Sequence, residues 1–282
     1  MVLAWFHPSH SFLLIIKPLV LIKSVKTDSI DQYKYRMKLG METFNTTIFK
    51  NKIVVVTGGT SGIGQAVSIA FAQKGAKVWA LGLQTDKAVY PTGLDIETVE
   101  IDVTDKTAID QFFSKLDRID TLFNGAGMGS ISEHELETYK KVLEVNLTSV
   151  FYISEVAAKA LAKSDNPSII NVSSLYANFG SAMAPAYACS KGAIDQLTFS
   201  HALSFAEAKI RVNAVAPGWI DTPLIQPLKD IPEVFNGIMQ RSPMARLGKP
   251  EEVANVVLFL ASDAASFING TIVKVDGAYS IF

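Results

Sequence analysis

From Lys52 onward, short runs of β-branched and other apolar residues alternate with longer amphipathic segments. The short runs have strand lengths, and the longer segments carry apolar residues at helical spacing. Such alternation is typical of βαβ units, which build a parallel sheet covered by helices on both faces. Strands are predicted at 53–57, 77–82, 98–101, 121–123, 168–172, 211–215 and 271–275, and helices at 63–74, 106–116, 137–163, 186–208 and 250–262. We therefore predict a single α/β domain at residues 49–282, with one doubly wound, parallel, seven-stranded sheet.

Two connections depart from this alternation. The segment 83–97 contains Pro91 and Gly93, which disfavour a crossover helix between the second and third strands. The segment 221–247 carries several prolines around one short predicted helix. An irregular insertion of this length beside the carboxyl edge of a sheet is typical of a mobile segment over a binding site. We expect residues 221–247 to form a lid.

The N-terminal residues 1–48 do not fit the alternating pattern. An apolar run at 11–22 is too short to span a bilayer and is interrupted by Lys17 and Pro18. A secretion signal is the alternative, but no small-x-small cleavage motif follows the run. We expect a poorly ordered N-terminal extension, translated upstream of a start at Met37 or Met41, and no stable insertion into a membrane.

The composition narrows the class of protein. With 49% hydrophobic and 19% charged residues, the 282-residue chain can bury the core of one large α/β domain. A formal net charge of -1 gives no basic field for a phosphate backbone, so nucleic acid is not expected as a partner. Cys189 is the only cysteine, which excludes an internal disulfide and fits a reducing, cytoplasmic location. The histidines have no carboxylate or cysteine at ligand spacing, so we expect no metal site.

A glycine-rich turn follows the first predicted strand and opens the first predicted helix. Its glycines allow the backbone to approach a pyrophosphate closely, while the N–H groups of the helix favour the negative charge. The spacing differs from the common G-x-G-x-x-G pattern, so the interpretation depends on the strand-to-helix context. We predict a dinucleotide site that includes Gly58, Thr60, Ser61, Gly62, Ile63 and Gly64.

The second and third strands end where the adenosine half of a dinucleotide would lie. An acidic residue after the second strand favours NAD and a basic one favours NADP, but the sequence there is Leu83-Gln84. Because the glycine turn has no basic residue either, we favour NAD over NADP, although Lys87 is close enough in sequence to reach a 2′-phosphate. Asp102 and Val103, after the third strand, are predicted to contact adenine; an ordinary strand-end carboxylate is the alternative for Asp102.

Tyr187 and Lys191 are four residues apart in a predicted helix, so their side chains lie on one face, one turn apart. Such a pair is common by chance and indicates chemistry only together with other motifs. Together with the other motifs, this pair makes the chain from about residue 50 to its end resemble the short-chain dehydrogenase/reductase family, which has a Rossmann fold. The motifs that carry the resemblance, in family order, are Thr57-Gly58-x3-Gly62-Ile63-Gly64, Asn124-Gly125-Ala126-Gly127, Asn146, Ser173-Ser174, Tyr187-x3-Lys191 and Pro217-Gly218-Trp219-Ile220-Asp221-Thr222.

The resemblance implies a catalytic quartet. It makes Tyr187 the general acid/base, and Lys191 its activator and a ligand of the cofactor ribose. Ser174 would donate to the carbonyl oxygen, and Asn146 would anchor a water in a proton relay. A nearby lysine and the positive charge of the cofactor would lower a tyrosine pKa from its usual value near ~10.

The resemblance also implies the remaining cofactor contacts. They are Leu83, Asn124, Ala126, Gly127, Tyr187, Lys191, Pro217, Gly218, Ile220 and Thr222. One position departs from the family pattern, because Gly125 stands where the family usually has a second asparagine that braces this turn.

Apolar and aromatic residues near these motifs favour an apolar or cyclic alcohol or ketone as the substrate. They are Met128, Leu175, Tyr176, Phe179, Met183, Trp219, Leu224 and Ile225. No arginine lies at 175–186, which gives a carboxylate-bearing substrate weak support.

These expectations together describe an NAD(P)-dependent oxidoreductase that transfers a hydride between its cofactor and a secondary alcohol or ketone. Two other functions on the same fold stay open. One is a catalytically inactive, cofactor-binding regulatory or scaffold protein, and the other is a lyase or epimerase with a transiently oxidised intermediate. The resemblance also implies a homotetramer, built through the helices predicted at 137–163 and 186–208 and the C-terminal strand region.

Overall fold

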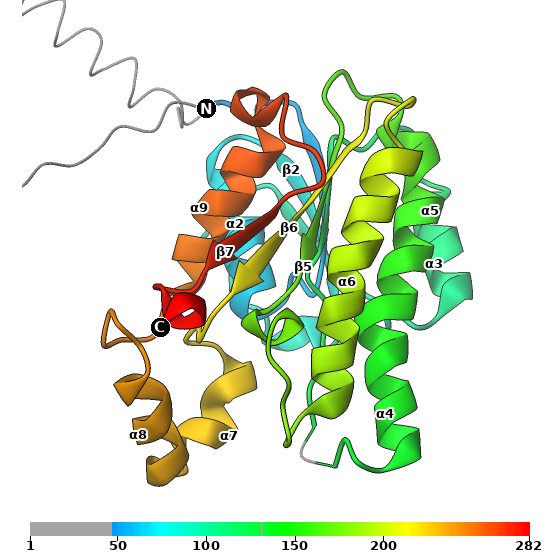
Figure 1. The fold of residues 1–282 in the computed structure, drawn as a ribbon. Coiled ribbons are helices and arrows are strands. Elements are labelled where there is room, and N and C mark those ends of the chain that lie inside the picture. Colours follow the sequence, from blue (N-terminus) through cyan, green and yellow to red (C-terminus); the bar gives the residue numbers. More distant parts are fainter. Residues whose placement is uncertain (1–46, 131) are drawn as a thin grey trace, which may run out of the picture. The chain divides into compact units, whose positions relative to one another are not determined.

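The computed structural model describes residues 47–130 and 132–282, so the expectations for residues 1–46 lie outside the described part of the chain. One parallel, seven-stranded sheet organises the described residues, with strand order β3-β2-β1-β4-β5-β6-β7 (Figure 1). This confirms the predicted fold class. The strands are β1 (Ile53–Thr57), β2 (Lys77–Gly82), β3 (Ile96–Glu100), β4 (Thr121–Asn124), β5 (Ser168–Val172), β6 (Arg211–Pro217) and β7 (Ile272–Val275).

Helices cover both faces of the sheet, which buries its central strands and explains their continuous apolar runs (Figure 1). On one face, α2 (Gly62–Gln73) and α9 (Pro250–Ala261) enclose a core that contains Phe71 and Val257. On the other, α3 (Lys106–Phe113) and α5 (Ser149–Leu161) enclose a core that contains Ile109 and Ile153. Within the described ranges, every helix is too short or too polar to cross a membrane.

The helical stretch predicted at 137–163 is present from Leu136 to Leu161, but it contains an irregular turn. The chain forms α4 (Leu136–Leu143), a π-helical turn η2 (Glu144–Thr148) and α5. The π turn admits one extra residue per turn, and the buried Asn146 lies inside it with its side chain bonded to the backbone of Met128. One extra residue does not interrupt a segment that is otherwise composed as a helix, so the sequence pattern did not reveal the π turn.

The other boundaries differ by small amounts. β3 begins two positions before the predicted strand, and α6 (Pro185–Ser204) ends before the predicted end at residue 208. In the segment 83–97, before β3 begins, the only helical residues are those of the 3-10 turn η1 (Thr85–Lys87), which confirms that no crossover helix joins β2 to β3.

The segment predicted as a lid leaves the sheet after β6. It contains a 3-10 turn, η4 (Pro223–Ile225), and two short helices, α7 (Gln226–Lys229) and α8 (Pro232–Gln240). Its base is closed by backbone hydrogen bonds, from Gly248 N–H to Trp219 C=O (2.9 Å) and from Asp221 N–H to Gly248 C=O (2.8 Å). The excursion therefore begins and ends at one point beside the carboxyl edge of the sheet.

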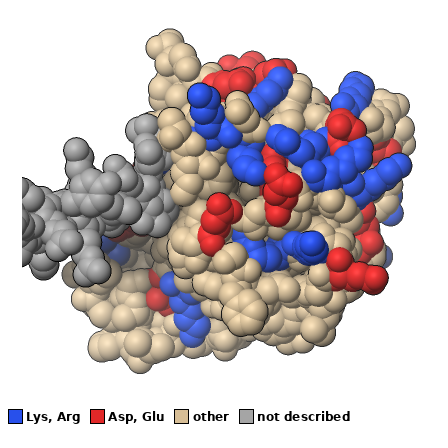
Figure 2. Space-filling view, turned by 90° about the horizontal axis from the view of Figure 1, so that it is seen from above, with Lys and Arg blue, Asp and Glu red and all other residues tan. Residues whose placement is uncertain are grey.

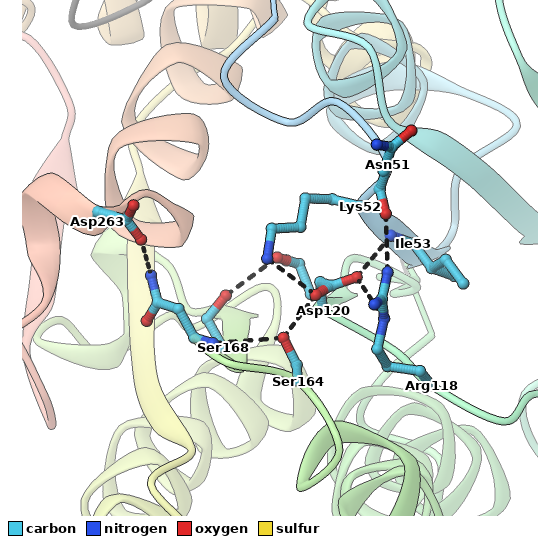
Figure 3. Close-up of polar contacts among 10 residues, drawn as sticks. Asn51, Lys52, Ile53, Arg118, Asp120, Ser164, Ser168 and Asp263 are labelled. Carbon is cyan, nitrogen blue, oxygen red and sulfur yellow. Dashed lines mark hydrogen bonds and ion pairs between the residues drawn. The ribbon is translucent and has the colours of Figure 1, made fainter.

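The amino edge of the sheet, opposite the lid, carries interspersed Lys, Arg, Asp and Glu side chains (Figure 2). At its centre lies the buried Asp120, which precedes β4 (Figure 3). Its carboxylate accepts hydrogen bonds from Ile53 N–H (2.8 Å), Lys52 Nζ (3.2 Å) and Ser164 Oγ (2.5 Å). Arg118 Nε lies 3.3 Å from the second oxygen. This cluster ties the starts of β1, β4 and β5 together.

Candidate active site

The carboxyl ends of β1, β4, β5 and β6 open into a cleft of about 660 Å³, and the lid supplies part of its wall. The cleft lies where the strand order reverses around β1, the usual place for a ligand in an open α/β sheet. The predicted site residues that line it are Gly58, Ser61, Gly62, Ile63, Gly64, Ala126, Gly127, Ser174, Tyr187, Lys191, Pro217, Gly218, Ile220 and Thr222. The predicted residues outside its lining are Thr60, Leu83, Asp102, Val103, Asn124 and Asn146.

The glycine-rich turn packs too tightly for side chains. Gly58 and Gly62 have φ angles of +66° and +51°, which disfavour other residues. A Cβ on Gly58 would lie 2.8 Å from the turn after β4, and one on Gly64 would lie 2.1 Å from the Gly58 carbonyl oxygen. The Ser61 side chain makes no capping bond to α2, whose first turn has no acidic residue. The helix N-terminus is thus open to an anion, and the turn fits a dinucleotide pyrophosphate.

The turn after β4 is braced by Thr57, which the sequence analysis quoted only as the start of the glycine motif. Thr57 Oγ1 accepts hydrogen bonds from Gly125 N–H (3.1 Å) and Ala126 N–H (3.2 Å). Asn124 donates to side chains on α5 and β5. A Cβ on Gly125 would lie 2.4 Å from the Phe123 ring, so a larger residue there requires rearrangement. Thr57 therefore supports the turn at the position where the family's usual second asparagine is missing.

The residues predicted for the adenosine half lie at the ends of β2 and β3. Thr60 Oγ1 donates to the Leu83 carbonyl (3.3 Å), and the Leu83 side chain is 58% exposed. Asp102 accepts from the N–H and hydroxyl of Thr104 (2.9 and 2.8 Å), which holds its carboxylate in a local turn. Val103 is buried in the core below. Their contact with adenine stays a prediction.

Three members of the expected quartet meet on the cleft wall. Ser174 follows β5 and caps the 3-10 turn η3 (Leu175–Ala177), accepting from Tyr176 N–H (3.2 Å). Tyr187 and Lys191 lie one turn apart near the start of α6, and the Lys191 ammonium is 5.4 Å from the centroid of the Tyr187 ring. Lys191 is only 4% exposed and donates to the Val172 carbonyl (2.7 Å).

The fourth member, Asn146, lies behind the wall. Its Oδ1 accepts from Met128 N–H (2.8 Å), and its Nδ2 donates to the Met128 carbonyl (2.9 Å) and to Ser190 Oγ (3.1 Å). A Cβ on Gly127 would lie 3.5 Å from Asn146 Oδ1 and 3.8 Å from Lys191 Nζ. Asn146 thus joins the strand end after β4 to α6, next to the lysine.

Burial governs the protonation of both catalytic candidates on α6. It raises the pKa of the Tyr187 phenol above its ordinary value, while a hydrogen bond with Ser174 lowers it to a smaller extent; Tyr176 and Glu133 raise it further. Burial lowers the pKa of Lys191 to about 8, and the nearby Asp195 carboxylate opposes this shift. The residues of the chain therefore do not by themselves lower the Tyr187 pKa as expected. The cost of burying the phenolate is larger than the stabilisation by the Ser174 hydrogen bond.

The substrate side of the cleft is aromatic. The rings of Tyr187, Tyr176, Trp219 and Tyr279 follow one another edge to face, with centroids 6.1, 6.0 and 6.3 Å apart. Of the predicted substrate residues, Leu175, Tyr176, Met183, Trp219, Leu224 and Ile225 line the cleft, and Met128 and Phe179 do not. Tyr279 was missed because it lies far along the chain after β7, with no motif around it.

Two charged residues near this wall were also missed. Glu133 lines the cleft and is only 1% exposed, although its sequence context, Ser132-Glu133-His134-Glu135, is typical of a solvated loop. Arg241, at the end of α8, places its guanidinium 5.1 Å from the Phe179 ring and 4.8 Å from the Tyr279 ring. Neither position carries a sequence signal that would have identified it.

The described histidines make local contacts. His134 Nε2 lies 2.7 Å from the Ala182 carbonyl oxygen. The buried His201 stacks on Phe151 and Phe205 and contacts Glu155 at 3.3 Å. In residues 47–130 and 132–282, no group of three or more His, Cys, Asp or Glu side chains has an arrangement that could hold a metal ion.

Comparisons with known proteins agree with this cleft. A family model described as Enoyl-(Acyl carrier protein) reductase matches residues 58–280. The chain is 36% identical to the 3-oxoacyl-[acyl-carrier-protein] reductase FabG of Thermotoga maritima, over 82% of this chain and 99% of that protein. It is 35% identical to the cis-4-hydroxycyclohexanecarboxylate dehydrogenase of Sinomonas cyclohexanicum, over 82% and 98%.

A solved structure is similar as well. It is of a Beutenbergia cavernae protein described as an NAD(P) dependent gluconate 5-dehydrogenase, with bound NADP at low occupancy. It has a TM-score of 0.78 and 30% sequence identity, and the match covers 84% of this chain and 100% of that chain. The family-model match at residues 58–280 includes the glycine turn, the Tyr187 helix and the lid.

Proposed function

The chain belongs to the short-chain dehydrogenase/reductase family, and from that premise we propose that its cleft interconverts a cyclic secondary alcohol and the corresponding ketone with NAD(P). Its relatives named above act as reductases of an oxoacyl group or dehydrogenases of a ring alcohol, the same reaction class. The observation that carries the proposal is the meeting of Ser174 and Tyr187 on the cleft wall beside the buried Lys191.

The carboxyl edge of the sheet would hold the cofactor. When bound, the nicotinamide exchanges a hydride with the carbon that carries the substrate oxygen. The N-terminus of α2 and the glycine turn would hold the pyrophosphate. The Lys191 ammonium would bond the ribose, and the segment from Pro217 to Thr222 would enclose the nicotinamide end. These assignments are supported by the tight glycine contacts and by the cleft lining.

Tyr187 and Ser174 would handle the proton and the oxygen charge. In reduction, the Tyr187 hydroxyl donates its proton to the substrate oxygen, and Ser174 donates a hydrogen bond to the same atom. In oxidation, the Tyr187 phenolate accepts the proton. Because burial raises the pKa of this phenol, the charges of Lys191 and the bound cofactor are needed to make the phenolate accessible. Asn146 would hold the segment around Gly127 and a relay water in register with Lys191.

We favour NAD over NADP because the end of β2 is unsuited to a 2′-phosphate. Glu100 pairs with Gly82 across β3 and β2, and its carboxylate accepts from Thr85 Oγ1 (3.1 Å). Lys87, the only nearby cation in this loop as described, donates to Gln84 Oε1 (3.0 Å). A carboxylate at this strand end repels a phosphate, whereas it can accept hydrogen bonds from ribose hydroxyls.

The aromatic row favours an apolar ring as the body of the substrate. A second candidate substrate is a ring that carries a carboxylate, and Arg241 favours it. Burial raises the pKa of the Tyr176 phenol on the cleft wall, and the positive charge of Arg241 lowers it to a smaller extent, so the field of this arginine extends to the cleft. If this is correct, Arg241→Met raises KM for a cyclic hydroxy acid about 5- to 10-fold and leaves KM for an uncharged cyclic alcohol unchanged. Equal KM changes for both substrates would exclude the second candidate substrate.

A homotetramer and a cytoplasmic location complete the proposal. Apolar side chains are exposed on α5 and α6, namely Phe151 (47%), Phe199 (38%) and Leu203 (80%), as expected for helices that pack against another subunit. The single, exposed Cys189 suits a reducing compartment. Light scattering coupled to gel filtration gives the mass in solution, and a monomer would contradict the tetramer.

The decisive experiment is a panel of cyclic ketones and secondary alcohols assayed with NADH, NADPH, NAD and NADP, by the absorbance of the reduced nicotinamide. We expect turnover of alicyclic substrates, with a higher kcat/KM for NAD than for NADP. Cofactor binding without turnover of any substrate would favour a scaffold protein. Substrate conversion without net change in nicotinamide absorbance would favour an epimerase or lyase.

A further inference from the structure

Glu133 is a buried carboxylate that has no role among the expected site residues. It lies between β4 and α4 and lines the substrate side of the cleft. Among the described residues, no Lys, Arg or His forms an ion pair with it. A buried carboxylate without a cation requires strong hydrogen bonds in compensation.

Backbone N–H groups provide those hydrogen bonds. Glu133 Oε2 accepts from Tyr187 N–H (2.9 Å), and Oε1 accepts from Ser130 N–H (2.9 Å). A Cβ on Gly129 would lie 3.6 Å from Glu133 Oε1 and 3.8 Å from Tyr187 Cδ2, so these groups are closely packed. One side chain therefore links the loop after β4 to the residue that carries the phenol.

The position of Tyr187 in α6 explains why this bond matters. α6 begins at Pro185 after Ala184, whose methyl side chain cannot cap the helix, and Tyr187 is the third helical residue. The N–H groups of a first helical turn have no partner within the helix. Glu133 supplies the cap from another element, and its negative charge also interacts favourably with the N-terminal end of the helix dipole.

We propose that Glu133 is a positioning residue for Tyr187. The Glu133 carboxylate caps α6 at the catalytic tyrosine and fixes the phenol relative to the substrate-side wall at Gly129 and Ser130. The proposal rests on Tyr187 being the acid/base of the proposed function. Because the carboxylate lies in the same cleft as the phenol, its charge also favours the protonated form of Tyr187. The other charged or titratable groups around this phenol are Lys191 on α6 and Tyr176 on η3; Asp195 lies near Lys191.

Two variants separate the effect of the Glu133 charge from the effect of its side-chain length. Glu133→Gln keeps the size but removes the charge, and its amide group cannot accept both N–H bonds. We expect kcat to fall about 10- to 100-fold, and the midpoint of the pH profile for alcohol oxidation to move to lower pH by roughly half a unit or more, since loss of a nearby negative charge lowers the phenol pKa. Glu133→Asp keeps the charge but is too short to bridge both groups, so kcat falls with an unshifted midpoint.

Glu135→Gln is the matched control, because Glu135 lies in the same loop, is exposed and makes no side-chain cap. It should change kcat and the pH midpoint by less than about 2-fold and 0.2 units. KM for the cofactor should stay within about 2-fold of the wild type in all three variants, because the glycine turn is untouched.

The outcomes are distinct. Wild-type kcat and pH midpoint in Glu133→Gln would overturn the proposal, and so would a lower melting temperature with an unshifted midpoint in that variant, which indicates a purely structural cap. Failure of both Glu133 variants to fold would overturn it for the same reason. If Tyr187→Phe retains activity, the proposed function fails first; if that variant is inactive and Glu133→Gln is normal, only the role of Glu133 fails.

Discussion

At the amino edge of the sheet, the Asp120 carboxylate is surrounded by donors from Lys52, Ile53 and Ser164, with Arg118 close by. At the carboxyl edge, the Lys191 ammonium has a backbone carbonyl as its hydrogen-bond partner, and burial lowers its pKa to about 8. The first arrangement satisfies a buried charge and joins three strands. The second leaves a buried charge under-satisfied, next to a phenol that is held protonated. One edge thus favours stability, whereas the other has a cost in stability at the residues proposed for catalysis.

The largest test of this contrast is removal of the phenol oxygen. Tyr187→Phe should lower kcat/KM about 10³-fold, because the proposed general acid/base is lost. The melting temperature should change by less than about 2 °C, since the hydroxyl joins no structural network comparable to that of Asp120. Steady-state kinetics and thermal unfolding measure both quantities. A large loss of stability with modest loss of activity would reverse the roles assigned to the two edges.

The converse variant at the amino edge is Asp120→Ala. It leaves the Ile53 N–H and two cations without their partner, and should lower the free energy of unfolding by about 3 kcal/mol. kcat should stay within about 2-fold of the wild type. Urea denaturation measures the stability change. The control is Asp117→Ala, which removes an exposed ion pair with Lys163 from the same region and should leave the free energy of unfolding close to that of the wild type.

A third variant tests the cofactor side of the carboxyl edge. The Cβ of Gly64→Ala would overlap the Gly58 carbonyl, so the turn must shift, and KM for NAD should rise about 30-fold, equivalent to about 2 kcal/mol. Gly180→Ala is the control, because a Cβ there meets open space and Gly180 is outside the cleft lining. Equal KM values for the two variants would show that the turn does not hold the cofactor.

The smallest expected effect concerns stability at the carboxyl edge. The pKa of Lys191 is about 8 in the folded chain and near 10.5 when exposed, so the unfolded chain binds more protons between these values and stability rises with pH across this window. Lys191→Met should abolish that rise, because the buried ammonium is gone. Below pH 8 the variant should be more stable than the wild type by about 1 kcal/mol, since the cost of burying the charge is removed and the loss of the cation near Asp195 offsets only part of this gain. Urea denaturation from pH 7 to 10 checks this. A less stable variant at pH 7 would contradict it.

The sequence predicted the sheet well because buried parallel strands such as 53–57 and 168–172 are short segments rich in β-branched residues with turns at both ends. The edge strand β3 is partly exposed and has a weaker pattern, so its start was misplaced. The π turn at Asn146 was missed because helical residues continue on both sides of it, and one extra residue within them leaves no composition signal. Local patterns thus specify elements better than the irregularities within them.

The site was predictable where local sequence determines function. The glycine turn and the spacing of Tyr187 and Lys191 are properties of single segments, and the structure brings them together in one cleft. Glu133, Thr57 and Tyr279 act through contacts with residues more than 50 positions away, so no window of sequence contains both partners. Such long-range contacts follow from topology, which only the folded chain displays.

The closed base of the lid has a practical consequence for engineering. Backbone hydrogen bonds join Gly248 to Trp219 and Asp221, so the two ends of the lid are anchored to each other as well as to the sheet. Residues 222–247 can therefore be exchanged as a cassette with those of a relative that has the same base. A chimaera built this way should inherit the ring preference of the donor while it keeps the nucleotide preference of the recipient, since the residues proposed to select the nucleotide lie outside the lid, at the ends of β2 and β3.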